Sequence, residues 1–408
     1  MTTQPHVVVV GAGIGGMATA LLVARTGASV TLLVRVAAPA AVGAGLLLQP
    51  NGLAVLDGLG LRPALDEVGH QITAADVRRT DGRLLMHAPI RDHGPGLDHA
   101  LAVRRSELHR LLHEAISRCG RVTTRLGAEV LSVDPAGHVH LAGPGPRLSG
   151  DLVVGADGVR SVVRASGDFG AVVTRTGATY VRAIVDGTDH GLLGEYWTRL
   201  GLFGGAPLGD GTTYFYAAAH APPVATALAR RDLPALQALW AAELAPAASL
   251  LGGVAAYDDL LVNDVARVDT ERWTHGASVL LGDAAHAMSP TLGQGANSAL
   301  VDAAVLADEL DQGGPVEDAV ARFERRRRTA VRKVQDTADR VAALSDAPES
   351  RRTSALTAVL RVLARSESVA ARQDRLVQQE HPGRLRDTVA LLGGAAHSRP
   401  TPTPPAGG

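Results

Sequence analysis

The sequence contains a single cysteine, Cys119, among its 408 residues. One cysteine excludes an internal disulfide, a cysteine-ligated zinc site and an iron–sulfur cluster. Such a low cysteine content is typical of proteins in a reducing compartment, and we therefore expect a cytoplasmic protein.

Lysine is equally scarce. Lys333 is the only one, and the other 39 basic residues are arginines. No glycine-rich loop precedes Lys333, so a phosphate-binding P-loop is excluded and a Schiff-base lysine is not expected. The serine-hydrolase motif Gly-x-Ser-x-Gly and the zinc motif His-Glu-x-x-His are missing as well. We expect no metal site.

The chain also lacks an excess of charge and a clear membrane segment. Its 40 basic and 41 acidic residues give a net charge of −1, with no basic surplus to bind nucleic acid or anionic lipid. Residues 7–24 are uncharged, but glycines interrupt them and no lysine or arginine precedes them. We therefore expect neither a nucleic-acid partner nor a membrane partner, and the oligomeric state stays open.

The N-terminal residues predict a nucleotide-binding unit. A β-branched run at 6–10 is typical of a buried parallel strand, 14–26 is typical of a helix, and 29–34 of a second strand. Between the first strand and the helix lies a Gly-x-Gly-x-x-G turn. Its glycines permit the backbone to approach a pyrophosphate, which the helix N-terminus stabilises.

Two further motifs follow the same pattern of a strand and a glycine turn. The second covers 155–164 and contains Asp157 and Gly158. The third covers 281–297, where Asp283 follows a predicted strand and a glycine-rich loop opens a long helix. An aspartate at the end of a strand can bind a polyol hydroxyl, and a helix N-terminus can stabilise negative charge on an electron-rich ring.

These three motifs, in this order and spacing, resemble the class A flavoprotein monooxygenases of the para-hydroxybenzoate hydroxylase-like group over about residues 5–345. The resemblance implies FAD, NAD(P)H and O2. It implies hydroxylation or epoxidation of an aromatic or polyketide-like small molecule through a C4a-hydroperoxyflavin. It also implies an α/β fold: a GR2-type Rossmann-like FAD-binding domain, an inserted, mostly antiparallel β-sheet substrate domain, and C-terminal helices.

We divide the chain on this basis. Residues 1–175 form the first part of the FAD-binding domain, with 70–97 contributing to the substrate domain. The later segments are the substrate domain (176–260), the second part of the FAD-binding domain (261–345), C-terminal helices (346–396) and a disordered tail (397–408). The strand predicted at 278–281 returns to the first sheet.

The resemblance also assigns site residues. The implied cofactor-binding residues are Gly11, Gly13, Gly16, Arg105, Asp157, Gly158, Asp283, Gly295, Ala296 and Asn297. Among them the glycines of the first turn hold the pyrophosphate and Asp283 holds the ribityl chain. Asp157 serves both FAD and NAD(P)H, and residues 295–297 bring a helix N-terminus to the pyrimidine side of the flavin. The implied catalytic residues are Pro290, near the reactive flavin edge, and Arg182.

One position departs from the pattern. Dinucleotide folds usually carry an acid at the end of the second strand, where this chain has Val34 followed by Arg35. Losing a charged hydrogen bond costs about 1.5–3 kcal/mol, or roughly 10- to 150-fold in affinity. The alternative is therefore a protein of the same fold with weakened or lost FAD binding that performs a non-redox step or binds a ligand.

Other residues are interpreted as structural. His109 and His113 lie four apart on a predicted helix without a third metal ligand, and His286 is expected to orient its loop. The arginines at 325–328 predict a solvated helix face. Three aromatic residues either line a substrate pocket or simply pack: Trp197, Tyr214 and Tyr216.

Overall fold

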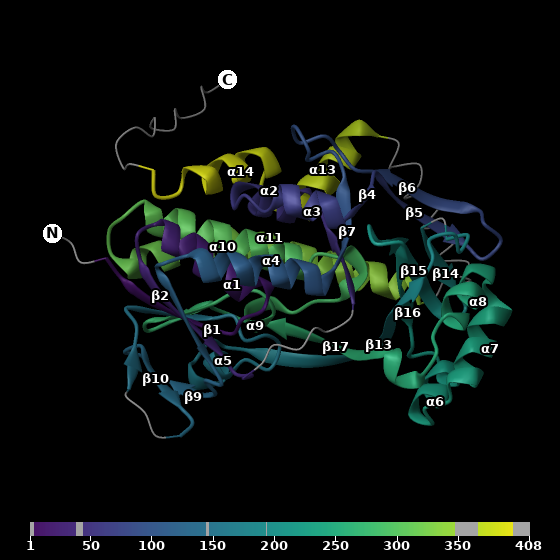
Figure 1. The fold of residues 1–408 in the computed structure, drawn as a ribbon, viewed down its shortest axis with the longest axis horizontal. Helices are drawn as coiled ribbons and strands as arrows, with labels where there is room; N and C mark the ends of the chain where they lie inside the picture. Colours follow the sequence, from purple (N-terminus) through teal and green to yellow (C-terminus); the bar gives the residue numbers. More distant parts are fainter. Residues whose placement is uncertain (1–3, 38–43, 144–146, 193, 347–365, 395–408) are drawn as a thin grey trace.

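The computed structural model describes residues 4–37, 44–143, 147–192, 194–346 and 366–394 (Figure 1). The predicted disordered tail, 397–408, lies outside these residues. Residues 347–365 of the predicted C-terminal helical segment (346–396) also lie outside the described residues.

A six-stranded, mainly parallel sheet forms the first half of the molecule, in the order β18-β19-β12-β1-β2-β8. The strands are β1 (His6–Val10), β2 (Ser29–Val34), β8 (Val122–Leu126), β12 (Leu152–Gly155), β18 (Thr274–His275) and β19 (Ser278–Leu280). Only the β18–β19 pair is antiparallel. The four valines of β1 are buried, as expected for a parallel strand covered on both faces. The predicted return of β19 to this sheet, beside β12, is confirmed.

Helices cover this sheet (Figure 1). Helix α1 (Ile14–Arg25) is buried from Ile14 to Ala24 because it lies between the sheet and two other helices, α4 (Arg105–Arg118) and α10 (Gly295–Asp311). The long helix α11 (Val316–Ser345) packs on α10. A small antiparallel sheet and a short helix follow α4 in the chain: β9 (Val130–Val133), β10 (His138–Leu141), β11 (Leu148–Ser149) and α5 (Val162–Ser166).

The second half is a seven-stranded sheet in the order β17-β13-β16-β15-β14-β5-β6, antiparallel except for the β14–β5 pair. Its strands are β5 (Ala74–Arg79), β6 (Leu84–Pro89), β13 (Val172–Asp186), β14 (Glu195–Thr198), β15 (Gly201–Pro207), β16 (Thr212–Ala218) and β17 (Leu261–Asp269). The predicted fold class, with its inserted and mostly antiparallel sheet, is confirmed. The exact domain limits stay a prediction. Since β17 pairs with β13, we propose that the substrate unit extends to Asp269.

Three helices cover the outer face of this second sheet: α6 (Pro222–Ala229), α7 (Leu233–Glu243) and α8 (Ala245–Gly252). These three helices are not predicted from the sequence. Their alanine-rich, proline-interrupted residues show only weak amphipathic periodicity, so the helices became recognisable only through their packing on the sheet.

A three-stranded sheet lies where the two halves meet, with β7 (Ala100–Arg104) between β3 (Gly45–Leu48) and β4 (His70–Ile72). Helices α2 (Pro50–Gly58) and α3 (Arg62–Val68) follow β3. The C-terminal helices are α13 (Glu367–Gln378) and α14 (Pro382–Leu391), and α14 packs on α2 (Figure 1). Two single 3-10 turns, η1 (Tyr257–Asp259) and η2 (Pro290–Leu292), and helix α9 (Asp283–His286) complete the described elements. None of the helices in the described ranges combines the length and apolarity needed to cross a bilayer.

Candidate active site

The first glycine turn packs tightly on the second motif. Gly11 has φ of +103°, and a Cβ there would lie 2.5 Å from the carbonyl oxygen of Ala156. A Cβ on Gly16 would overlap the carbonyl oxygen of Gly11. Both positions therefore require glycine for the packing of the protein itself.

Gly13 differs from its neighbours. It is the N-cap of α1 with φ of −72°, and a Cβ there would meet no protein atom within 4 Å. No side chain caps α1, and its first turn holds no acidic residue. The helix thus presents a positive N-terminus with free space beside it, which suits an anionic group such as a pyrophosphate.

Asp157 organises the second motif. Its carboxylate accepts hydrogen bonds from the Ser161 hydroxyl and from the backbone N–H groups of Val162 (2.6 Å) and Val163 (3.2 Å). The aspartate thereby caps the start of α5 and shapes the loop that contacts Gly11. Gly158 follows it with φ of +79° and nothing within 4 Å of a Cβ position. A direct contact of either residue with a cofactor stays a prediction.

The third motif presents an unpartnered carboxylate. Asp283 is the first residue of α9 and is exposed, and none of the described residues donates a hydrogen bond to it. A Cβ on Gly295, at the start of α10, would lie 3.9 Å from Asp283 Oδ1. The first turn of α10 has no acidic residue and no side-chain cap. Pro290 begins the η2 turn between these two helices.

Residues Gly295 to Asn297 form the first turn of α10, and Asn297 secures that turn. The Asn297 side chain is fully buried; it accepts the N–H of Gln49 (3.0 Å) and donates to the carbonyls of Leu47 (3.0 Å) and Gly293 (2.8 Å). These bonds fix the helix start against β3 and α2. The side chain is thus committed to structure, and the backbone of Gly295 and Ala296 is what the turn offers to a ligand.

The first and third motifs meet at α10, and the second motif packs on the first at Gly11. A Cβ on Gly15 would lie 2.9 Å from the Ala299 side chain, and one on Gly282 would lie 3.1 Å from it. Two helix N-termini and one free carboxylate therefore converge. A pyrophosphate and a polyol chain would complement these groups, so the residues present fit FAD.

Arg105 connects this region to the second sheet. Burial lowers the pKa of its guanidinium, nearby Asp283 raises it, and Arg182 on β13 lowers it. Arg105 nevertheless keeps substantial solvent exposure. The electrostatic influence of Asp283 and Arg182 on Arg105 indicates that these three predicted residues lie near one another.

The three aromatic residues Trp197, Tyr214 and Tyr216 were expected either to line a substrate pocket or to pack in the core, and they differ in this respect. Trp197 is 7% exposed and packs in a core with Tyr180, so it is mainly a packing residue. Tyr214 and Tyr216 are partly exposed on the same face of the sheet. Arg182 lies directly opposite Tyr216 in the β13–β16 register.

A buried polar network that the sequence analysis did not identify holds the third motif. Asp302, on α10, accepts the N–H of Gly282 (3.0 Å) and pairs with His286 Nε2 (2.6 Å). Its other oxygen accepts Arg327 Nε–H (2.8 Å). Burial by itself raises the pKa of Asp302, but His286 and Arg327 lower it to about 2. His286 thus has the orienting role expected, whereas the prediction of a solvated face at 325–328 is wrong for Arg327, which has no exposed surface.

The network continues into the C-terminal helices. Arg327 Nη2–H donates to Gln379 Oε1 (2.6 Å), and the Gln379 amide donates to Ser298 Oγ (2.7 Å) and Gln294 Oε1 (3.0 Å). The segment after α13 thereby fastens the start of α10. One signal in the sequence does point to this network: Asp302 is a lone charge inside an apolar helical run, which is typical of a buried ion pair.

Two expectations concern residues near the first turn. His109 Nε2 hydrogen bonds to the carbonyl oxygen of Ala12 (3.0 Å), and no group of three possible metal ligands occurs in the described ranges. Val34 is 7% exposed and pairs with Leu126 of β8, so the end of β2 supplies no carboxylate.

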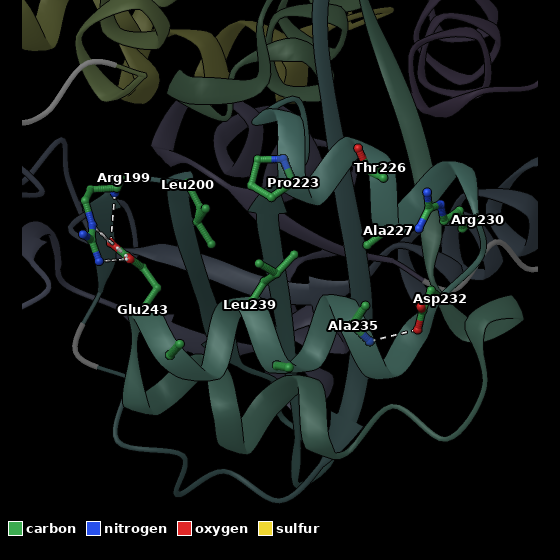
Figure 2. Close-up of a pocket in the computed structure, with 12 residues that line it drawn as sticks. Arg199, Leu200, Pro223, Thr226, Ala227, Arg230, Asp232, Ala235, Leu239 and Glu243 are labelled. Atoms are coloured by element: carbon green, nitrogen blue, oxygen red, sulfur yellow. Dashed lines mark hydrogen bonds and ion pairs between the residues drawn. The ribbon is translucent and has the colours of Figure 1, made fainter.

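A groove lies elsewhere, against the helices that cover the second sheet. It measures about 850 Å³ and runs between α6 and α7, lined mainly by apolar side chains (Figure 2). The Arg199–Glu243 ion pair closes one end, and Arg230 and Asp232 lie at the other. Since α6 and α7 cover the face of the sheet opposite Arg182, this groove holds none of the predicted site residues.

Comparison with known proteins agrees with this geometry. The family model described as "FAD binding domain" matches residues 4–338. The chain is 31% identical to aurachin C monooxygenase/isomerase of Stigmatella aurantiaca, over 79% of this chain and 85% of the relative. It is 32% identical to 2-heptyl-3-hydroxy-4(1H)-quinolone synthase of Mycobacteroides abscessus, over 90% and 97%.

Solved structures give the same result. A variant of 2-methyl-3-hydroxypyridine-5-carboxylic acid oxygenase is 27% identical, with a TM-score of 0.74 over 89% of this chain and 99% of the other. The family match disfavours the alternative of a lost cofactor, although Val34 is still an unusual residue at its position. The chain therefore belongs to the class A flavoprotein monooxygenases and is an FAD-dependent monooxygenase.

Proposed function

We propose that this enzyme uses NAD(P)H and O2 to hydroxylate or epoxidise an aromatic or polyketide-like small molecule. FAD, when bound, would supply the redox chemistry, namely hydride acceptance from NAD(P)H and activation of O2. The observation that carries the proposal is the free carboxylate of Asp283, facing the N-terminus of α10 beside Arg105.

The chain's own residues then bind, orient and exclude water. We assign the pyrophosphate to the turn at Gly13 and the ribityl hydroxyls to Asp283. The backbone at Gly295 and Ala296 would stabilise negative charge on the flavin ring, which is electrostatic preorganisation by a helix end. Asp157 acts through the loop that it caps.

On the substrate side, Arg182, Tyr214 and Tyr216 would line the pocket opposite a bound flavin, and Pro290 would lie near its reactive edge. The names of the relatives support an aromatic substrate, since they refer to a quinolone and a pyridine compound. Catalysis of this kind depends on position and on a dry site more than on a strong acid or base.

The first test is the absorbance spectrum of the purified protein, followed by titration with FAD and by NAD(P)H oxidation with phenols and quinolones. We expect flavin bands and substrate-stimulated NAD(P)H oxidation with incorporation of one oxygen atom. A protein that takes up no FAD at saturating concentration would exclude the proposal and favour the non-redox alternative.

Asp283→Ala is expected to weaken FAD binding by roughly 10- to 150-fold, because a charged hydrogen bond contributes about 1.5–3 kcal/mol. Quenching of flavin fluorescence during titration measures the dissociation constant. Asp283→Asn is the matched control: its amide still bonds a hydroxyl, so the loss should be smaller. Unchanged affinity in Asp283→Ala would show that this carboxylate does not contact FAD.

Val34→Glu is expected to tighten FAD binding by about 10-fold or more, because it restores an acceptor for ribose hydroxyls at the end of β2. Val34→Leu should leave the affinity unchanged. The same fluorescence titration compares the three proteins. If Val34→Glu binds FAD no better than the parent, the ribose is held by other residues and the departure at Val34 has no cost.

A further inference from the structure

The second sheet carries a carboxylate with no role so far, Glu195 on β14, which is hydrogen bonded to Tyr216 on β16. Glu195 Oε1 accepts Trp197 Nε1–H (2.8 Å), and the Tyr216 hydroxyl is bonded to Glu195 Oε2 (3.0 Å). Side chains alternate along strands, and Tyr196 and Phe215 pack toward the covering helices. Glu195 and Tyr216 therefore point to the opposite face.

That face is turned toward the FAD-binding half. Tyr214, two residues from Tyr216, packs on the same small cluster as Leu47 of β3, and a Cβ on Gly45 would overlap the Tyr214 ring. The rings of Tyr214 and Tyr216 lie 5.9 Å apart. The pair with Glu195 thus continues the surface that Arg182 and Tyr214 form.

Protein surrounds both residues without sealing them off completely, and Tyr216 packs at the border of the cluster that contains Tyr180 and Trp197. Burial raises the pKa of Glu195 and of Tyr216, which shows that protein surrounds them. Each nevertheless keeps partial solvent exposure. Gly204 of β15 leaves room for the Tyr216 hydroxyl, since a Cβ on Gly204 would lie 2.6 Å from the hydroxyl oxygen.

We infer that Tyr216, oriented by Glu195, accepts a hydrogen bond from a hydroxyl or ring N–H of the aromatic substrate and thereby selects substrates that carry such a donor. The inference rests on the proposed function. The indole N–H of Trp197 can only donate, and an ionised carboxylate can only accept. The Tyr216 hydrogen is therefore directed to Glu195, and the free lone pairs of its oxygen are left for the substrate.

Protonation of Glu195 reverses this arrangement. A protonated carboxyl donates to Tyr216, whose own hydrogen then points away from Glu195. Binding of a donor substrate is therefore expected above the pKa of Glu195 and lost as the pH falls through it. Among the described residues, Tyr180 and Tyr214 also act electrostatically on Tyr216, and Arg182 lies opposite it in the β13–β16 register. Asp346 acts on Tyr180.

The test uses FAD-loaded enzyme and two pairs of probes. One pair is 4(1H)-quinolone and its 1-methyl derivative; the other is 2-methyl-3-hydroxypyridine-5-carboxylate and its 3-methoxy analogue. Dissociation constants come from the change in flavin absorbance. We expect at least one donor-bearing probe to bind about 100-fold or more tightly than its methylated partner, because a buried acceptor left unpaired is costly.

Three variants separate orientation from general structure. Tyr216→Phe should reduce that ratio below about 10-fold. In Glu195→Gln the single amide oxygen must serve Trp197, so the amide N–H donates to Tyr216; the ratio should fall equally and lose its pH dependence. Tyr180→Phe, on the same face, should retain the parent ratio. Normal FAD content in each variant confirms folding.

Several outcomes would overturn the inference. These are equal binding within both pairs, no binding of any probe by FAD-loaded parent enzyme, or an unchanged ratio in Tyr216→Phe. Failure of the proposed function has a different signature: the parent protein would not bind FAD, or would not oxidise NAD(P)H with any aromatic compound.

Discussion

Replacing Asp302 by asparagine is expected to lower the free energy of unfolding by about 3–5 kcal/mol, because the charge of Arg327 then stays buried without a counter-ion. Neither side chain has any exposed surface. The new amide would also oppose the N–H of Gly282, which Asp302 now accepts. Denaturation by urea, followed by circular dichroism with and without FAD, measures the change.

Glu309→Gln is the matched control for this prediction. Glu309 also lies on α10 and pairs across to α11, but its partners Arg322 and Arg326 are about one-third exposed. Partly exposed pairs contribute only about 0–1 kcal/mol. Equal destabilisation by the two variants would show that the buried pair of Asp302 has no special weight.

The lowered pKa of Asp302 predicts that the folded protein loses stability in acid. The Asp302 carboxyl has a pKa lowered from 3.8 to about 2 in the folded protein. Its contribution to stability is therefore complete above the unfolded value and is lost as the pH falls toward 2. The difference in stability between parent and Asp302→Asn should shrink over that range.

Gly13→Ala and Gly16→Ala are expected to affect different properties of the first turn. At Gly13 a methyl group meets no protein atom, so the fold should keep its stability while FAD affinity falls by about 100-fold or more, since a pyrophosphate needs close backbone approach. At Gly16 a methyl group overlaps the Gly11 carbonyl, so stability should fall by about 1–3 kcal/mol as well.

Melting temperature and FAD titration, measured on both variants, distinguish these effects. If Gly13→Ala binds FAD normally, the pyrophosphate does not lie at the N-terminus of α1. If Gly16→Ala has the same melting temperature as the parent protein, the turn has an alternative packing on Ala156.

Local sequence patterns predicted a large part of this architecture. Strand β2 was predicted at its observed limits, and α1 and the return of β19 within a residue or two. These elements follow from valine runs and glycine turns, which restrict the backbone locally. Helices α6 to α8 were not predicted, since their stability comes from one shared face on the sheet.

The roles of individual charges were much less accessible. Arg327 belongs to a run of four arginines that is typical of a solvated surface, yet it is the one that meets Asp302. Arg327 is buried because α11 packs on α10 at this position. Burial of a charge depends on the neighbouring helix and not on the adjacent residues in the sequence.

The sequence by itself therefore determined the cofactor class, through three motifs whose glycines and aspartates act over a few residues. The tertiary structure alone decided which side chains share a space: Asp283 with Arg105, Arg182 with Tyr216, and Tyr216 with Glu195. The physical reason is that backbone conformation is set by short-range sterics, whereas substrate recognition depends on groups brought together from distant strands.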